Sequence, residues 1–398
     1  MNIGIFTDTY YPEINGVASS TYELKKGLEK LGHSVTIFTV TNPAATKQEK
    51  QVYRITSVPF PMLKERRIGV TLSKIWEQKI KKLHLDVIHT QTEFIMGHLG
   101  KKMADRLGIP HIHTYHTIYE DYLSYLHMPD KQCFRKIVQH FSRICCNRAD
   151  EIIVPTEKVE NLLGQYGVTS QVHVIPSGIS LPKFANPNID HVEELKRQLN
   201  ISDDKMVLLY VGRLSAEKNI AELLSYVHKT GQQGEITFLL VGDGPEREAL
   251  EQQVQRLHLE SSVIFTGMVP FDQIEDYYAL GNIFVSASTS ETQGLTYIEA
   301  LASGMPLLVR QDDCLDGILR DYENGIGYED EETFRQGFRF LNTAIRQNPR
   351  FSQKTIRKSV SSLGQSTFAL QVEKIYQNRM IKQDVSQNEE NHGTIHAA

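Results

Sequence analysis

The chain contains 398 residues, a length typical of two or three domains. Hydrophobic residues make up 40% and charged residues 23%, with 26 Gly and 14 Pro, which excludes collagen-like, low-complexity and fully disordered proteins. The formal net charge of −5 argues against a dedicated nucleic-acid-binding protein, because such proteins usually carry a basic excess.

The charge is distributed unevenly along the chain. Residues 1–180 carry a balance of +5, whereas the remaining residues carry −10. This asymmetry reflects either drift between two domains or a first half that meets an anionic surface or ligand. None of the four cysteines forms a Cys-x-x-Cys pair, and neither a signal peptide nor a run of about 18 apolar residues is present. We therefore expect a cytoplasmic protein with reduced thiols.

Short β-rich apolar runs alternate along the chain with segments of helical period. The first series of expected strands is Ile3–Thr7, Ser34–Thr39, Asp86–His89, His111–Tyr115, Glu151–Val154 and Val172–Ile175. The second series is Val207–Val211, Thr237–Val241, Val263–Thr266, Ile283–Ser286 and Pro306–Val309. Amphipathic stretches such as Ser20–Leu31 and Glu246–Leu257 separate them. This alternation predicts an α/β protein with two doubly wound domains built on parallel sheets.

Proline and glycine place the domain boundary in residues 176–190, which include three prolines. We expect an N-terminal Rossmann-like domain over 1–180 and a C-terminal one over 181–365. A helix over 366–382 is expected to pack towards the first domain. The polar residues 383–398 are expected to form a disordered tail.

Ligands of open α/β sheets bind beyond the carboxyl ends of the strands, so the residues after each strand are the candidates. In the first loop, Asn15-Gly16 permits a close backbone approach ahead of a helix N-terminus, which favours an anion; a plain turn fits equally well. His116 follows another strand among polar aromatic residues. Both a structural and a catalytic histidine fit that position.

Two loops of the second half also contain candidate residues. Gly212 permits a sharp turn, and Arg213 and Lys218 follow it near the start of a helix. The planar guanidinium of Arg213 and the compact charge of Lys218 can bind a diphosphate there. A solvated charged loop is the alternative. The next loop, Val241-Gly242-Asp243-Gly244-Pro245, suits a tight strand-to-helix turn as well as a ligand loop.

The segment 290–300 is the most informative of these loops. Gly294 lets backbone amides approach a phosphate at the start of a helix. Glu291 lies in the loop and Glu299 on the helix, so one carboxylate can bind a sugar and the other a ribose. The alternatives are a capping acid and a helix-surface acid.

Two basic amphipathic segments bear on membrane contact. Residues 64–83 place apolar side chains at near-helical spacing among a basic cluster, with contact expected at Lys64, Arg66, Arg67, Trp76, Lys79, Lys81 and Lys82. Packing against a sheet is the alternative. The segment Phe134–Cys145 has a more regular apolar period, which favours packing in the core.

Together these residues resemble the retaining glycosyltransferases of family 4, over nearly the whole chain to about residue 380. The most specific marker is E-x7-E, here Glu291 to Glu299, followed by Ala300-Leu301-Ala302-Ser303-Gly304-Met305-Pro306. The Gly212–Asn219 loop and the Val241–Pro245 loop are the further markers. The resemblance implies the GT-B architecture, in which two Rossmann-like domains face a central cleft.

The resemblance also implies roles for individual residues. Arg213 and Lys218 would bind the donor diphosphate, and Glu299 would bind the ribose and Glu291 the sugar. His116 would contact the donor sugar and the acceptor side. The remaining donor contacts would come from Gly16, Met268, Gly294, Leu295 and Thr296. Many relatives have two adjacent glycines where this chain has Asn15-Gly16.

Two segments, 115–122 and 289–299, are most similar to bacterial diacylglycerol glucosyltransferases. That resemblance implies retaining transfer of glucose from UDP-glucose to the 3-hydroxyl of 1,2-diacylglycerol, at the inner face of the cell membrane. No tightly bound cofactor is expected, and Mg²⁺ is left open, since no Asp-x-Asp motif occurs. A soluble or polyprenyl-linked sugar acceptor and a non-catalytic nucleotide-sugar-binding protein are the alternatives. The oligomeric state is left open.

Overall fold

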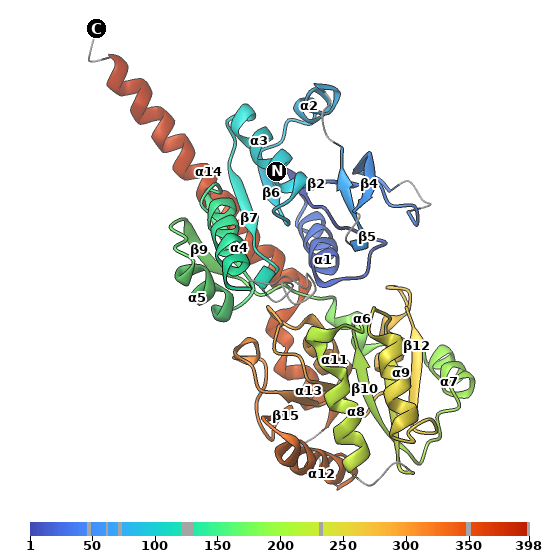
Figure 1. Cartoon of the computed structure of the whole chain (residues 1–398). Coiled ribbons are helices and arrows are strands. Elements are labelled where there is room, and N and C mark those ends of the chain that lie inside the picture. Colours follow the sequence, from blue (N-terminus) through green and yellow to red (C-terminus); the bar gives the residue numbers. More distant parts are fainter. Residues whose placement is uncertain are drawn as a thin grey trace. The chain divides into compact units, whose positions relative to one another are not determined.

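The computed structural model describes residues 1–45, 49–60, 63–70, 74–120, 131–230, 234–347 and 352–395. The chain divides into two compact units (Figure 1). Unit 1 contains Met1–Gly178 and Gln365–Ala398, and unit 2 contains Ile179–Gly364. The division falls at Gly178 and Gly364, where the sequence predicted boundaries at 180 and 365.

Unit 1 is built on a parallel sheet with the strand order β3-β2-β1-β6-β7-β8-β9 among the described residues. Its strands are β1 (Asn2–Phe6), β2 (Ser34–Val40), β3 (Val52–Ile55), β6 (Val87–Thr90), β7 (His111–Thr114), β8 (Glu151–Val154) and β9 (Gln171–Val174). Strands of a parallel sheet are covered on both faces, which explains their continuous apolar runs. The order reverses between β1 and β6, so the loops after these two strands border the same switch point.

Helices cover both faces of this sheet. They are α1 (Gly16–Lys30), α2 (Lys74–Lys81), α3 (Ile95–Leu107), α4 (Lys131–Cys146), α5 (Glu157–Gln165) and α14 (Gln365–Ile395). Leu24 and Leu28 of α1 share a buried cluster with Val372 of α14 on one face. Ile80 of α2 and Met103 of α3 belong to another buried cluster.

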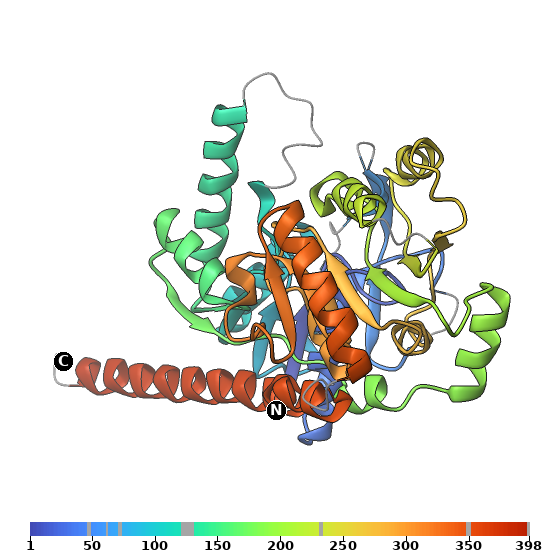
Figure 2. The same ribbon diagram turned by 90° about the horizontal axis from the view of Figure 1, so that it is seen from below.

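The C-terminal helix α14 packs beside α1 (Figures 1 and 2). Glu373 accepts a hydrogen bond from His33 Nε2 at 2.8 Å, and the Tyr376 hydroxyl lies 2.6 Å from His89 Nδ1 in the sheet. The helix continues to Ile395, past residue 383, where the polar composition predicted a disordered tail. Residues 383–395 contain no proline, so no residue there interrupts the helical backbone that continues from the packed part of α14.

A hairpin interrupts the alternation in unit 1, in a segment for which the sequence analysis expected helical spacing. β4 (Ser57–Phe60) pairs antiparallel with β5 (Leu63–Gly69). The expected helical period of residues 64–83 is therefore wrong for its first part, and only α2 is helical. Extended backbone prevails here because β5 gains ladder hydrogen bonds from β4, which the spacing of apolar residues does not reveal. Strand β3 was also missed.

Unit 2 is built on a second parallel sheet, with the order β12-β11-β10-β13-β14-β15 among the described residues. Its strands are β10 (Met206–Val211), β11 (Ile236–Val241), β12 (Val263–Gly267), β13 (Ile283–Ser286), β14 (Leu307–Arg310) and β15 (Gly325–Tyr328). This is the strand order of the Rossmann fold, with its switch point between β10 and β13.

The helices of unit 2 form two groups whose members contact one another. One group is α8 (Ile220–Lys229), α9 (Arg247–Arg256) and α12 (Glu331–Gln347). The other is α6 (Leu181–Ala185), α10 (Ile274–Tyr278), α11 (Leu295–Ser303) and α13 (Gln353–Ser359). Helix α7 (Ile189–Gln198) contacts α10. A single apolar core runs through the unit, with Leu208, Leu239 and Phe284 of the sheet fully buried.

Candidate active site

The loops after β10 and β11 lie backbone against backbone at the edge of the unit 2 sheet. A Cβ atom at Gly242 would lie 1.9 Å from the carbonyl oxygen of Gly212, and one at Gly244 would lie 2.3 Å from that of Leu214. Leu214 N–H donates to the Asp243 carbonyl at 3.0 Å. The two glycines of the Val241–Pro245 loop therefore have a packing role, which holds the Gly212–Asn219 loop in place.

Lys218 and Glu291 form an ion pair at the switch point. Lys218 ends the short 3-10 helix η2 (Ala216–Lys218) after β10, and Glu291 follows β13. Lys218 Nζ lies 2.5 Å from Glu291 Oε1, and their side chains are 20% and 21% exposed. Burial alone would lower the pKa of Lys218, but Glu291, followed by Tyr210 and Glu217, together outweigh burial and raise the pKa above its ordinary value. The lysine is therefore cationic at neutral pH.

The N-terminus of α11 is shaped by Gly294. This residue has φ +71° and precedes the helix without a side chain that could cap it. A Cβ atom there would lie 2.3 Å from the ring of Tyr297, whose hydroxyl lies 3.1 Å from Ser286 Oγ in β13. Leu295 and Thr296 form the first turn, where backbone N–H groups have no carbonyl partner within the helix. Such amides favour an anion.

The second carboxylate of the motif is held by a tyrosine from another helix. Tyr278 of α10 donates its hydroxyl hydrogen to Glu299 Oε2 at 2.7 Å, and burial followed by Glu299 raises the pKa of this tyrosine well above its ordinary value. Glu299 lies in the second turn of α11, beyond Gly294. Met268, just after β12, is 57% exposed, which suits a side chain that meets a flat ligand.

Arg213 is positioned through its backbone. The Tyr210 hydroxyl donates to the Arg213 carbonyl at 3.0 Å. Burial raises the pKa of Tyr210, so the hydroxyl stays a donor at neutral pH. Arg213 follows β10, at the same switch point as the Lys218–Glu291 pair. The donor residues that the sequence predicts in unit 2 therefore come from the loops after β10, β12 and β13 and from the start of α11.

In unit 1, Gly16 and its neighbours border the corresponding switch point. Gly16 is the exposed first residue of α1. Asn15 caps this helix by accepting a hydrogen bond from Ala18 N–H at 3.0 Å, and its amide donates to Thr9 Oγ1 at 2.7 Å. Asn15 is therefore a helix cap that also fixes the loop after β1.

His116 lies at the carboxyl end of β7. Its Nε2 lies 2.7 Å from Oε1 of Gln91, which follows β6. Burial, and next the nearby His113, lower the pKa of His116 to about 3. The imidazole is therefore neutral at physiological pH, and the ring can act only as a neutral hydrogen-bonding group there.

Sequence reasoning missed Gln91, Tyr210 and Tyr278. Each holds a predicted residue: Gln91 holds His116, Tyr210 holds the backbone of Arg213, and Tyr278 holds Glu299. Only Gln91 had a signal in the sequence, because it lies two residues after the predicted strand Asp86–His89. Tyr210 lies inside a strand and Tyr278 on a different helix, so no spacing pattern connects them to their partners.

The expected membrane-contact residues of unit 1 have different surroundings. The side chains of Lys64 and Arg66 lie outside the described residues. Arg67 Nε donates to Ser57 Oγ at 2.8 Å, so its guanidinium braces the hairpin. In α2, Lys79 lies over the rings of Tyr53 and Trp76, at 4.2 and 5.0 Å from their centroids. Lys81 and Lys82 are exposed.

Helix α4 departs from the expected core packing of Phe134–Cys145. Ser142 and Cys146 are buried, but Ile137 is 55% exposed and Ile144 36%. Close to the helix, Phe94 stacks on Phe141 and is itself 52% exposed. The expectation is wrong for this part of the helix, because the apolar stripe is wider than the surface that covers it. A regular period does not reveal how much of a stripe is covered.

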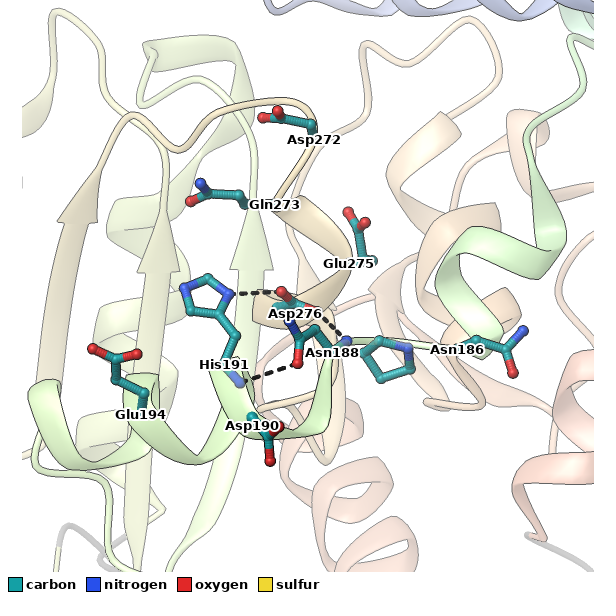
Figure 3. A pocket seen from close by; sticks show the side chains of 10 residues that line it. Asn186, Asn188, Asp190, His191, Glu194, Asp272, Gln273, Glu275 and Asp276 are labelled. Carbon is teal, nitrogen blue, oxygen red and sulfur yellow. Dashed lines mark hydrogen bonds and ion pairs between the residues drawn. The ribbon is translucent and has the colours of Figure 1, made fainter.

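A separate hollow of about 640 Å³ lies in unit 2 around the start of α7 (Figure 3). Its lining residues are Asn186, Pro187, Asn188, Asp190, His191, Glu194, Asp272, Gln273, Glu275 and Asp276. Asp276 accepts hydrogen bonds from His191 Nδ1 and from Asn188 N–H, both at 2.7 Å (Figure 3). With five carboxylates in its lining, this hollow is unsuited to an anionic ligand such as a nucleotide diphosphate.

Within the described ranges, no group of three or more His, Cys, Asp or Glu side chains is placed to hold a metal ion. None of the helices in the described part of the chain is long and apolar enough to cross a bilayer.

Two family models match the chain. Glycosyltransferase Family 4 matches residues 14–182, and Glycosyl transferases group 1 matches residues 191–343. Alpha-monoglucosyldiacylglycerol synthase of Streptococcus pneumoniae is 39% identical over 96% of this chain and 86% of its own length. The synthase of the same name from Acholeplasma laidlawii is 35% identical over 88% of this chain and 89% of its own length.

Solved structures confirm the expected fold. Anabaena HepE in complex with UDP has a TM-score of 0.73 at 19% identity, over 95% of this chain and all of that one. Sucrose-phosphate synthase of Thermosynechococcus elongatus has a TM-score of 0.74 at 22% identity, over 95% of this chain and 99% of its own. The two Rossmann-like units are those of the GT-B fold. The chain belongs to the family 4 glycosyltransferases.

Proposed function

We propose that the protein transfers glucose from UDP-glucose to the 3-hydroxyl of membrane 1,2-diacylglycerol, with retention, and so makes alpha-monoglucosyldiacylglycerol. The proposed acceptor rests on the 39% identity, over 96% of the chain, to a synthase of that name. A second synthase of the same name supports it at 35% identity. The geometry of unit 2 supports the donor.

The donor diphosphate is proposed to lie at the switch point of unit 2. Arg213 and Lys218 supply cations, and the amides of Leu295 and Thr296 point from the start of α11. HepE, with which this chain shares its fold, has been solved with UDP and with UDP-glucose. We assign the glucose to Glu291 and the ribose to Glu299, and the base to the surface beside Met268.

The chemical difficulty in this reaction is the charge that develops on the departing diphosphate. Preorganised cations and amides stabilise that charge without reorganising during the reaction. The bond between the glucose carbon and the phosphate oxygen breaks, and a bond from that carbon to the acceptor oxygen forms on the same face. The hydroxyl proton passes to the departing phosphate. Gly16 is assigned to the diphosphate, and His116 to the sugar and the acceptor hydroxyl.

Diacylglycerol resides in a bilayer, so the protein is proposed to act as a peripheral protein on the inner face of the cell membrane. We assign the contact to six basic residues and one tryptophan: Lys64, Arg66, Arg67, Lys79, Lys81, Lys82 and Trp76. The exposed Ile137 and Ile144 of α4 support a second contact. That helix contains Lys131, Arg135, Lys136 and Arg143 and no acidic residue, which suits an anionic surface.

The decisive experiment incubates the protein with labelled UDP-glucose, UDP-galactose or GDP-mannose and with vesicles that contain diacylglycerol. We expect a labelled glucolipid from UDP-glucose, and NMR of the product should show the α-anomer. Transfer only to a soluble or polyprenyl-linked sugar would contradict the lipid acceptor. Thermal stabilisation by UDP without turnover of any donor would indicate a non-catalytic binding protein.

A further inference from the structure

A hydrogen bond in unit 1 fixes the chemical form of His116. Gln91 is 2% exposed, and its backbone N–H donates to the Phe6 carbonyl at 2.8 Å, at the end of β1. Its side-chain Oε1 lies 2.7 Å from His116 Nε2. An amide oxygen can only accept a hydrogen bond, so His116 Nε2 must hold the proton.

The other ring nitrogen is left as an acceptor. In a neutral imidazole one nitrogen holds the proton and the other a lone pair, so the lone pair of His116 is on Nδ1. Among the described residues, His116 has no hydrogen bond other than that to Gln91. Nδ1 is thus a single acceptor at the carboxyl edge of the sheet, beside the switch point.

Gln91 itself has an unsatisfied donor. Within the described residues, its Nε2 is buried and has no hydrogen-bond partner. A buried polar group without a partner costs about 1–3 kcal/mol. An apolar residue of similar length would avoid that cost, so stability alone does not account for a glutamine at this position. The hydrogen bond that Gln91 accepts from His116 does account for a glutamine here.

We propose that Gln91 is a positioning residue: it holds His116 as the Nε2–H tautomer, so that Nδ1 accepts a hydrogen bond from the acceptor hydroxyl as the acceptor docks. This inference rests on the proposed function and adds a residue to it. The ring places the hydroxyl oxygen beside the glucose carbon before the reaction. As that oxygen attacks and the bond to phosphate breaks, the hydroxyl hydrogen turns from Nδ1 to the departing phosphate oxygen. The proton leaves with the diphosphate, so the ring remains neutral throughout.

The surroundings of His116 suit an uncharged partner. Among the described residues, His113 on β7 and His89 on β6 interact electrostatically with His116, and both disfavour a second positive charge nearby. Glu93 lies 3.2 Å from His113 Nε2 rather than beside His116. A carboxylate in place of the Gln91 amide would still accept from Nε2, but it would also stabilise the imidazolium, which lacks the Nδ1 lone pair.

The tautomer is tested directly by ¹⁵N NMR of the imidazole nitrogens in the full chain, with His116→Asn to identify the signals. We expect Nε2–H in the wild-type protein and in Gln91→Glu at high pH, and a mixture of tautomers in Gln91→Met. An Nδ1–H ring in the wild-type protein would overturn the proposal whatever the enzyme's activity.

Transfer kinetics supply the second test. Gln91→Met should lower kcat about ten- to a hundredfold with little change in KM for the donor, since a misplaced group affects the reacting geometry. Gln91→Glu should recover transfer at high pH and lose it as the pH falls, a dependence that a structural role would not produce. The control is Gln253→Met, which removes a surface hydrogen bond to Ala221 in unit 2.

Equal kcat values and pH profiles for Gln91→Met and the wild-type protein would contradict the proposal. If the wild-type protein transfers its sugar to an acceptor other than diacylglycerol, the same comparison is made with that acceptor. A wrong acceptor assignment would appear as transfer to another molecule, whereas a wrong role for Gln91 would appear as equal kcat values in Gln91→Met and the wild-type protein.

Discussion

Lys218 Nζ lies 2.5 Å from Glu291 Oε1, and the two residues come from loops that follow neighbouring strands of the unit 2 sheet. The pair is about one-fifth exposed, so each charge depends on the other for compensation. In the proposed donor site, a diphosphate would provide Lys218 with a second anionic partner, and Glu291 would then accept hydrogen bonds from the sugar. The ion pair thus links the two roles that the site requires.

We expect Lys218→Ala and Glu291→Ala each to lower transfer by about a hundredfold or more, because each removes a preorganised charge beside the reacting bond. The double variant should lose less than the product of the two single effects, since both residues belong to one unit. Initial rates with UDP-glucose and vesicles that contain diacylglycerol measure this.

The matched control for the Lys218 and Glu291 variants is Lys229→Ala. This substitution breaks an ion pair in which Lys229 lies 2.6 Å from Glu331, and the Lys229 side chain is 53% exposed. Transfer should be nearly unchanged in this variant, because exposed pairs contribute little. Near-normal turnover in both Lys218→Ala and Glu291→Ala, with folded protein, would contradict the site assignment.

Much of the fold could be predicted because parallel strands leave a local signal. Buried runs such as Val207–Val211 and helices of regular period appear in the sequence, and their alternation already specifies two doubly wound units. Strand β3 and the hairpin of β4 and β5 could not be predicted, since their residues are only partly apolar. Extended backbone there is set by pairing with β2 and between the two hairpin strands.

The candidate site was predictable where residues follow strands. Lys218, Glu291 and His116 were found in this way, because the carboxyl ends of parallel strands meet at one edge of a sheet. Their partners were not, since the contact between Tyr278 and Glu299 joins two helices that no spacing rule relates. The exposure of Ile137 was also hidden, because it depends on what the rest of unit 1 covers.

Gly294→Ala should destabilise unit 2 and weaken UDP binding. The residue has φ +71°, and an added Cβ would meet the Tyr297 ring at 2.3 Å, so strain and a steric clash add together. Gly317→Ala is the control, because Gly317 has φ +74° but nothing within 4 Å of an added Cβ. We expect the control to cost about 1 kcal/mol and Gly294→Ala distinctly more, measured by urea unfolding. Equal losses would show that the ring moves aside freely.

Acid should destabilise unit 1 through its buried histidines. Burial, and next His113, lower the pKa of His111 to about 3, whereas an unfolded histidine titrates near 6.5. Between these values the unfolded chain binds the extra proton, so this contribution to stability is complete above about pH 6.5 and is lost as the pH falls towards 3. His111→Asn should therefore flatten the pH dependence in this window by about 1.4 kcal/mol per pH unit.

The measurement is urea unfolding between pH 4.5 and 7.5, followed by the fluorescence of Trp76, the single tryptophan, which lies in unit 1. His84→Asn is the control, since His84 is exposed and its φ of 47° suits asparagine. An unchanged pH slope in His111→Asn would mean that His111 is protonated to the same extent in the folded and unfolded chains.

Two isoleucines of α2 should separate folding from membrane contact. Ile80 is fully buried in the cluster with Phe38 and Met103, so Ile80→Ala should lower the free energy of unfolding by about 2–5 kcal/mol.

Ile75 is 72% exposed, so Ile75→Ser should leave the free energy of unfolding unchanged. It should weaken binding to anionic vesicles by about tenfold, because an inserted isoleucine gains on the order of 1.5–3 kcal/mol on leaving water. Vesicle sedimentation and Trp76 fluorescence report binding, and Ile137→Ser applies the same test to α4. If neither serine variant binds more weakly than the wild-type protein, the apolar side chains of α2 and α4 do not enter the bilayer, and the exposed lysines alone are left to make the contact.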